Sequence, residues 1–248
     1  MKKMITGAAA CGTLLATGTP AQAAPKDPVR ALTAQFAPGQ GVRFTEKANW
    51  SDGTDTLQAQ TSKGVLQFDR KGLAAYDITT TSWDDEKSRT IAIGRTAYHS
   101  GGILTKMLPK GKTWFKRKGG GAPPGVYGQI LNPAEPTTLS ALIENGARAG
   151  GKVAGVITFK ELAKVSPWFA RSGVSTWAAE TKIDYTLTLT SAGLVGKLSS
   201  SYTATGVKND YSEFEGSVVT VDTRYTGWGS KVSVKAPNPK TVTDKLFD

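Results

Sequence analysis

Two short runs of residues have types that could do chemistry: the only histidine, His99, followed by Ser100, and the acidic run Asp84, Asp85 and Glu86. A serine, a histidine and an aspartate can act as nucleophile, general base and orienting group. The chain has no Gly-x-Ser-x-Gly motif, which marks the nucleophile turn of α/β-hydrolases. We therefore interpret His99 as a strand-end histidine, and the sequence predicts no catalytic residue.

The acidic run could supply oxygen ligands for Ca²⁺. Its spacing matches no calcium loop, and it lies between two predicted strands, so we interpret it as a solvated turn. One histidine and one cysteine in 248 residues exclude a zinc finger, an iron–sulfur site and a disulfide framework. The three glycines at 119–121 lack the Lys-Ser/Thr of a phosphate-binding loop. We expect no metal and no cofactor.

The N-terminus has the pattern of an export signal. Residues 2 and 3 are lysines, and residues 4–24 carry no charge and end in a small-x-small motif before Ala24. This combination is typical of a secretory signal peptide, and its glycines make it too broken for a stable membrane-spanning helix. The sequence predicts a signal peptide over 1–23 and a single mature domain over 24–248.

Cys11 offers a second interpretation of the same segment. Its surroundings weakly match a lipobox, in which a cysteine is diacylated and becomes the mature N-terminus. Ala8 stands where leucine is usual, and the apolar segment before Cys11 is very short. Lipidation at Cys11 stays open as the alternative to cleavage after Ala23. Both alternatives predict an extracytoplasmic protein, secreted or associated with the cell envelope.

The formal net charge of +11 is concentrated in one stretch. Between Lys87 and Asn132 there is no acidic residue but nine basic ones, and residues 2 and 3 carry two further positive charges. The nine are Lys87, Arg89, Arg95, Lys106, Lys110, Lys112, Lys116, Arg117 and Lys118. Without these eleven charges the rest of the chain is neutral, so the basic block needs its own explanation.

Three interpretations of the basic block are open. It could contact anionic lipid head groups or a membrane surface, bind nucleic acid, or be a passive solvated patch that adheres loosely to anionic wall polymers. The export signal argues against nucleic acid. Strand alternation places Trp114 on the same face as two lysines, where an aromatic ring could anchor the chain at an interface. The residues expected to make anionic head-group or membrane contact are Lys106, Lys110, Lys112, Trp114, Lys116, Arg117 and Lys118.

The elements that position these residues are mostly strands. Asp27 before Pro28 predicts the start of a first helix, Pro136 opens a second that runs to the glycines at 150–151, and residues 103–108 predict a short helical turn. Alternating, threonine-rich stretches predict ten strands, over residues 42–50, 56–68, 73–83, 90–99, 113–118, 152–162, 182–190, 194–205, 217–228 and 231–235. The predicted fold class is α+β, with a large curved antiparallel sheet, or half-barrel, covered by two or three helices.

The order of several short stretches resembles the LppX/LprG-type envelope lipoproteins of actinobacteria, which are similar in fold to the LolA/LolB lipoprotein carriers. TIAIGRTAYHS at 90–100 resembles a strand of that family with a Gly-x-x-x-Tyr pattern, and KTWFKRK at 112–118 resembles the next strand. The remaining stretches are the helix at 132–148, the strand at 151–162, the turn at 192–194 and the tail at 231–244. The poor lipobox and the insertion at 166–176 depart from the family pattern.

The resemblance implies a hydrophobic cavity under the helices and binding of lipid or lipid-linked ligands. The expected cavity-lining residues are Phe44, Leu57, Leu66, Ile91, Ile93, Leu104, Met107, Leu139, Leu142 and Ile143. An ordinary packed core would use the same residue types. The predicted function is an exported, monomeric, non-catalytic lipid carrier that binds no nucleic acid. Two alternatives remain: a protein-interaction or sensing module of the same fold, which a filled core would favour, and a secreted hydrolase.

Overall fold

The computed structural model describes residues 27–119, 127–207 and 214–247. The predicted signal peptide and Cys11 lie outside these residues. Within them, all strands belong to one twelve-stranded sheet with the order β12-β6-β5-β4-β3-β2-β1-β11-β10-β9-β8-β7. Neighbouring strands are antiparallel except β12, which pairs with β6 in parallel. The strands are β1 (Gln40–Ser51), β2 (Thr56–Asp69), β3 (Gly72–Ser82), β4 (Lys87–Ile93), β5 (Thr96–Gly101), β6 (Trp114–Lys118), β7 (Gly146–Ala149), β8 (Lys152–Thr158), β9 (Lys182–Leu189), β10 (Val195–Thr203), β11 (Val218–Lys231) and β12 (Val242–Thr243).

Only one face of the curled sheet is buried. In β1, Phe44, Glu46 and Ala48 are buried, whereas Arg43 and Lys47 point to solvent. This alternation continues across β2, β9, β10 and β11, so an inner face packs against the core and an outer face meets water.

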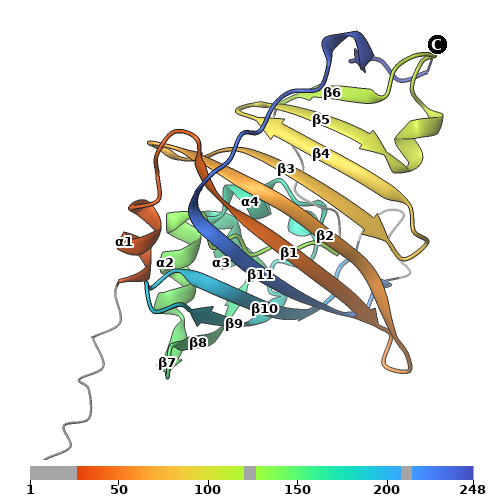
Figure 1. The fold of residues 1–248 in the computed structure, drawn as a ribbon. Coiled ribbons are helices and arrows are strands. Elements are labelled where there is room, and N and C mark those ends of the chain that lie inside the picture. Colours follow the sequence, from red (N-terminus) through yellow and green to blue (C-terminus); the bar gives the residue numbers. More distant parts are fainter. Residues whose placement is uncertain (1–26, 120–126, 208–213, 248) are drawn as a thin grey trace, which may run out of the picture.

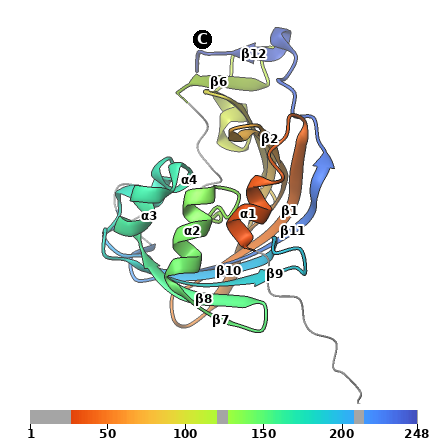
Figure 2. The same ribbon diagram turned by 90° about the vertical axis from the view of Figure 1, so that its left-hand side faces the viewer.

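Short helices lie within the curve of the sheet (Figures 1 and 2). The α-helices are α1 (Pro28–Thr33), α2 (Pro136–Glu144), α3 (Phe159–Val165) and α4 (Pro167–Ala170), and the 3₁₀ turns are η1 (Gly102–Lys106), η2 (Gly173–Thr176) and η4 (Pro239–Thr241). Figure 2 shows α2, α3 and α4 on the concave side, with α1 beside α2, while β6 and β12 extend beyond the helices. The predicted curved antiparallel sheet with covering helices is confirmed. No helix of the described ranges is long and apolar enough to cross a membrane.

Turn chemistry places some boundaries differently from the prediction. The expected strand over 90–99 is part of a hairpin, because Gly94 adopts a φ of +55° in a two-residue turn between β4 and β5. The expected strand over 152–162 ends at Thr158, which forms a capping box with Glu161 and starts α3. The second helix ends at Glu144, before the glycines at 150–151, because β7 begins at Gly146. The expected strand over 217–228 is confirmed as part of β11, whereas the expected strand over 231–235 is wrong, because β11 ends at Lys231 and residues 232–235 have no regular secondary structure.

Gly155 on β8 allows the sheet to approach the end of α2. A Cβ atom at this position would lie 2.5 Å from the Asn145 carbonyl oxygen and 2.6 Å from the Tyr185 hydroxyl oxygen. That hydroxyl donates a hydrogen bond to the Leu142 carbonyl oxygen at 2.5 Å. Gly155 therefore makes room for a bond that ties β9 to α2.

Gly155→Ala should lower the free energy of unfolding by about 1–3 kcal/mol, because the end of α2 or Tyr185 must move. Gly173→Ala is the matched control, since a Cβ there meets no atom within 4 Å. Urea unfolding of both variants measures the difference. Equal stability of the two variants would contradict the role given to Gly155.

Candidate functional site

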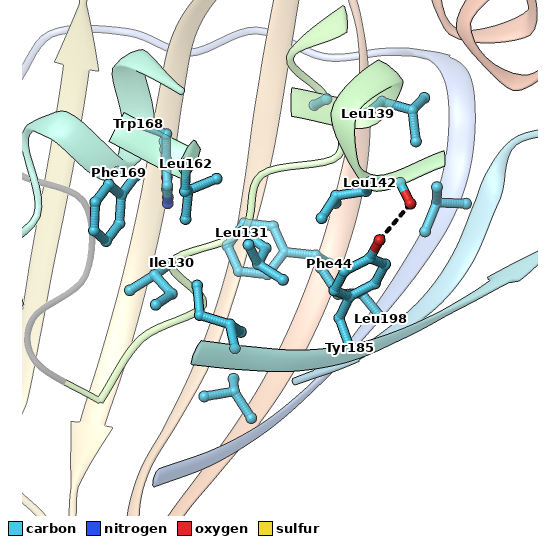
Figure 3. Close-up of a cluster of buried hydrophobic side chains, with 14 of the residues drawn as sticks. Phe44, Ile130, Leu131, Leu139, Leu142, Leu162, Trp168, Phe169, Tyr185 and Leu198 are labelled. Carbon is cyan, nitrogen blue, oxygen red and sulfur yellow. Dashed lines mark hydrogen bonds between the residues drawn. The ribbon is translucent and has the colours of Figure 1, made fainter. Parts of the chain in front are cut away.

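The centre of the concave face is filled by a segment without regular secondary structure. Residues 127–135, which we call the plug segment, contain eight consecutive buried residues, from Gly128 to Glu135. Figure 3 shows Ile130 and Leu131 between the helices and the strands that carry Phe44 and Leu198. A buried irregular segment is unusual, because its backbone polar groups lack the partners that helices and sheets provide.

Gln129 anchors the first half of the plug segment. Its Nε2 donates to Thr223 Oγ1 at 3.3 Å, and its Oε1 accepts a hydrogen bond from Ser200 Oγ at 2.9 Å. Its backbone carbonyl oxygen accepts from Trp168 Nε1 at 2.9 Å. One residue thus connects β10, β11 and α4 through the centre of the molecule.

Glu135 anchors the second half of the plug segment. Its Oε2 accepts hydrogen bonds from Ser166 Oγ at 2.7 Å and from Thr138 Oγ1 at 2.9 Å, and its Oε1 accepts from the Trp168 amide at 2.8 Å. Burial raises the pKa of Glu135, and these hydrogen bonds oppose the rise. The carboxyl group therefore fastens the plug segment to the junction between α3 and α4.

Glu46 lies under the plug segment on the inner face of β1. It is 5% exposed, and its Oε2 accepts a hydrogen bond from Thr223 Oγ1 at 3.4 Å. Among the described residues, its Oε1 and the Asn132 Nδ2 have no hydrogen-bond partner, and both residues line a cavity of about 20 Å³. A water molecule needs at least roughly 10–15 Å³, so one ordered water could bridge this acceptor and this donor. Burial raises the pKa of Glu46 to about 7.

The size of this cavity determines what the concave face can hold in this arrangement. Pockets for small-molecule ligands have volumes of about 300–1,000 Å³. The space of about 20 Å³ between Phe44, Leu66, Leu131 and Trp168 is more than tenfold smaller. Among the described residues, an acyl chain can therefore occupy this position only if the plug segment moves.

Half of the expected cavity-lining residues come together around this centre. Phe44, Leu66, Leu139 and Leu142 belong to the core cluster, and Ile143 packs against it.

The other expected lining residues do not join them. Ile91 is buried, but it alternates with the core residue Ala92 and so lies on the outer face of β4. Leu57 is 53% exposed and Ile93 is 37% exposed. Leu104 on η1 and Met107 after it are half-buried, beyond the helices.

Sequence reasoning missed the residues that fill and anchor the centre. Ile130, Leu131 and Gln129 lie where the sequence shows neither periodicity nor a motif. The sequence pattern places Trp168 in an insertion, yet its ring packs edge-on against Tyr76 with ring centroids 5.3 Å apart. Glu46 could have been found, because it occupies an inward position between Phe44 and Ala48.

The basic block is divided between two faces of the sheet. Trp114 is half-buried and shares the outer face with Lys116 and Lys118, and the Arg89 guanidinium lies 5.7 Å from its ring centroid. Arg117 points to the opposite face.

Three further lysines of the block lie off the strands. Lys106 ends η1, Lys110 is exposed in the turn that follows, and Lys112 donates from Nζ to the Lys240 carbonyl oxygen at 3.0 Å.

The histidine and the acidic run stay separate. His99 Nδ1 lies 3.2 Å from Thr90 Oγ1, whereas Ser100 points to the other face of β5. Burial and the nearby charge of Arg117 lower the pKa of His99. The Asp84 carboxylate accepts hydrogen bonds within its own turn, from Ser82 and from the Glu86 amide. No three His, Cys, Asp or Glu residues of the described ranges form a group that could hold a metal ion.

A scan against protein-family models and a search of curated proteins found no match. Among solved structures, the chain is similar to the lipoprotein LppX of Mycobacterium tuberculosis, with 10% identity over 84% of this chain and 96% of that one, and a TM-score of 0.41. A LolA superfamily protein from Nitrosomonas europaea is similar at 8% identity over 81% and 90% of the two chains, with a TM-score of 0.36. Both TM-scores lie below 0.5, so these similarities carry no argument about the function of this chain.

Glu46 should make stability fall as pH rises. Between pH 4.5 and about 7 the folded protein keeps a proton on Glu46 that the unfolded chain has lost. The stabilisation is therefore complete below pH 4.5 and is lost as pH rises through about 7, by roughly 3 kcal/mol. Tyr225, which faces Glu46, stays neutral in this range because burial raises its pKa well above 10.

Urea unfolding at pH 5 and pH 8 measures this difference. Glu46→Gln should remove most of the loss of stability between the two pH values, and the smaller part due to Glu135 should remain. Glu180→Gln, at an exposed position, is the matched control and should keep the full pH dependence. An unchanged pH dependence in Glu46→Gln would show that Glu46 is ionised in the folded protein at both pH values.

Proposed function

We propose that this protein is an exported, non-catalytic binding protein for a lipid or lipid-linked ligand of the cell envelope. In this proposal the acyl part of the ligand enters the concave face in place of the plug segment. The main support for this proposal is the position of Ile130 and Leu131. These two side chains fill the apolar centre of the concave face, and they belong to a segment with no regular secondary structure.

The energies of such an exchange are close to balanced. Burying the fifteen or so methylene and methyl groups of a long acyl chain contributes roughly 12 kcal/mol at 0.8 kcal/mol per group. Displacing Ile130 and Leu131 costs about 3–6 kcal/mol of burial. Losing the five hydrogen bonds that join the plug segment to Thr223, Ser200, Ser166 and Trp168 costs about 3–8 kcal/mol more. A near balance suits a carrier that must both take up and release its cargo.

The outer side of β6 is the proposed contact for anionic head groups or an anionic membrane. Lys116 and Lys118 follow Trp114 on the same face of this strand. A lysine near an anionic bilayer contributes about 1 kcal/mol, and a tryptophan ring suits the interface.

A specific observation favours a second function. The cavity under the helices has a volume of only about 20 Å³, as expected for a filled core. A protein-interaction or sensing module of the same fold, without a lipid ligand, would need no more space than this.

Lipid analysis of natively isolated protein separates the two functions. The carrier should release bound lipid on mass spectrometry of the denatured protein. Replacing Ile130 and Leu131 together with alanine should tighten binding of a fluorescent fatty-acyl probe at least about tenfold, because less apolar burial must be displaced. Leu131→Ala alone, with a smaller gain, serves if the double variant does not fold.

Leu32→Ala is the control, because Leu32 is buried on α1, outside the plug segment. It should leave probe affinity unchanged. Absence of co-isolated lipid, together with no probe binding by any variant, would refute the carrier and favour the interaction module.

The membrane contact has its own test. Lys116→Gln combined with Lys118→Gln should weaken binding to anionic vesicles roughly thirtyfold, from about 1 kcal/mol per lysine. Arg117→Gln is the matched control, because Arg117 lies on the opposite face of the same strand. Sedimentation of the variants with vesicles measures the binding, and thermal unfolding checks the fold. Equal vesicle binding by both variants would show that the basic block is a passive solvated patch.

A further inference from the structure

Basic residues also gather on the outer face of the central strands, outside the acid-free stretch of the sequence. We call Arg43, Lys47, Lys63, Lys197 and Arg224 the basic grid. Strand register makes it continuous: Lys197 is opposite Arg224, Arg224 is opposite Thr45, and Thr45 is opposite Lys63. These residues come from β1 and β2 near the start of the described chain and from β10 and β11 near its end, so only the fold brings the two pairs of strands together.

The dimensions of the basic grid follow from strand geometry. Neighbouring strands lie about 4.8 Å apart, and alternate residues along a strand are roughly 7 Å apart. Arg43 and Lys47 flank Thr45 at two positions on either side of it along β1. Five cations therefore lie within an area of roughly 14 by 14 Å on one face, which Figure 1 views from the front.

Few of these charges are neutralised. Among the described residues, the grid takes part in one ion pair, between Lys197 Nζ and Asp222 at 2.7 Å. Asp222 is also opposite Lys47 in register. Arg43 Nη1 donates to Ser230 Oγ at 2.8 Å, a bond that leaves its charge in place. Lys63 and Arg224 are exposed and form no ion pair with a described residue.

The surface around the basic grid is hollowed. Arg43, Lys63 and the threonines 45, 79 and 226 line an open trough of about 430 Å³, together with the ion pair between Arg89 and Asp77. A neighbouring trough of about 680 Å³ runs over β8 to β11, lined by Lys197, by serine and threonine hydroxyls, and by two carboxylates, Asp184 and Asp222, of which Asp222 is paired with Lys197.

A linear polymer fits these troughs better than a flat bilayer does. The exposed large hydrophobic side chains, which a membrane contact would use, lie outside the first trough, and only Val156 reaches the second. They are Leu57, Trp83, Ile93, Ile103, Val156 and Phe247.

We propose that the outer face of the sheet binds a linear phosphate-bearing polymer, laid along the two troughs with its phosphates on Arg43, Lys63 and Arg224. Lysine and arginine provide the charge, and the serine and threonine hydroxyls donate to phosphate oxygens. The site is independent of the proposed lipid function, because it lies on the opposite face of the sheet from the plug segment. A substitution can therefore abolish polymer binding without affecting lipid binding, and the reverse.

Long-chain polyphosphate is the probe, with tripolyphosphate as a short comparison. The test variant replaces Arg43, Lys63 and Arg224 with glutamine. The control replaces Lys71, Lys160 and Lys164, which are exposed outside the basic grid, and so removes the same net charge. Isothermal titration at several salt concentrations gives the affinity and its salt dependence, and thermal unfolding checks that both variants fold.

The wild type should bind polyphosphate at least about tenfold more tightly than tripolyphosphate. The test variant should lose at least about tenfold in polyphosphate affinity, and its slope of log affinity against log salt should fall by about two, since each cation contributes about 0.7 for a single-stranded polyanion. The control should stay within about threefold of the wild type. Equal losses of polyphosphate affinity in both variants would show that net charge alone determines binding and would overturn the proposal. Unchanged polyphosphate affinity in the test variant would refute the site. Loss of anionic-vesicle binding without polyphosphate binding would assign the face to membranes and overturn the proposal.

Discussion

A curled sheet that buries its concave face must fill the centre of that face, and here an irregular segment fills it. Helices α2, α3 and α4 cover the concave side, while Ile130 and Leu131 occupy its middle. Because the plug segment has no ladder of its own, side chains must satisfy its buried groups. Gln129 and Glu135 do so, and they thereby join two strands of the sheet to α4. The packing of the core, the small cavity and the raised pKa of Glu46 all depend on this segment staying in place.

Strand alternation lets the same sheet present two unlike faces. The inner face is apolar except for buried groups such as Glu46 and Thr223, whereas the outer face carries arginine, lysine and threonine. Substitutions on the outer face can change surface charge without disturbing the core, and substitutions in the plug segment leave the outer face intact. A lipid function on one face and a polyanion function on the other are therefore physically separable.

The sheet was predictable because alternation and turn residues are local signals. The alternating pattern of residues 42–50 predicts a half-buried strand, and these residues lie within β1. Asp27 followed by Pro28 predicts the start of α1. The division into β4 and β5 depends on Gly94, which adopts a positive φ in the turn between them. The alternating, threonine-rich pattern on both sides of Gly94 predicts one continuous strand instead. The plug segment was not predictable, because its burial is set by contacts to residues 33 to 94 positions away, such as Trp168 and Thr223. The charge pattern of the sequence does not reveal the basic grid, because its residues come from four strands that each carry a net charge of only 0 or +1.

The central claim is that the plug segment gives way to an acyl chain. Amide hydrogen exchange, followed by mass spectrometry with and without a long-chain lysophospholipid, tests it most directly. The account predicts that peptides covering residues 127–135 exchange faster when the lipid is bound, because the hydrogen bonds at Gln129 and Trp168 are broken, while β10 and β11 stay protected. Lipid binding with unchanged exchange over residues 127–135 would contradict the claim.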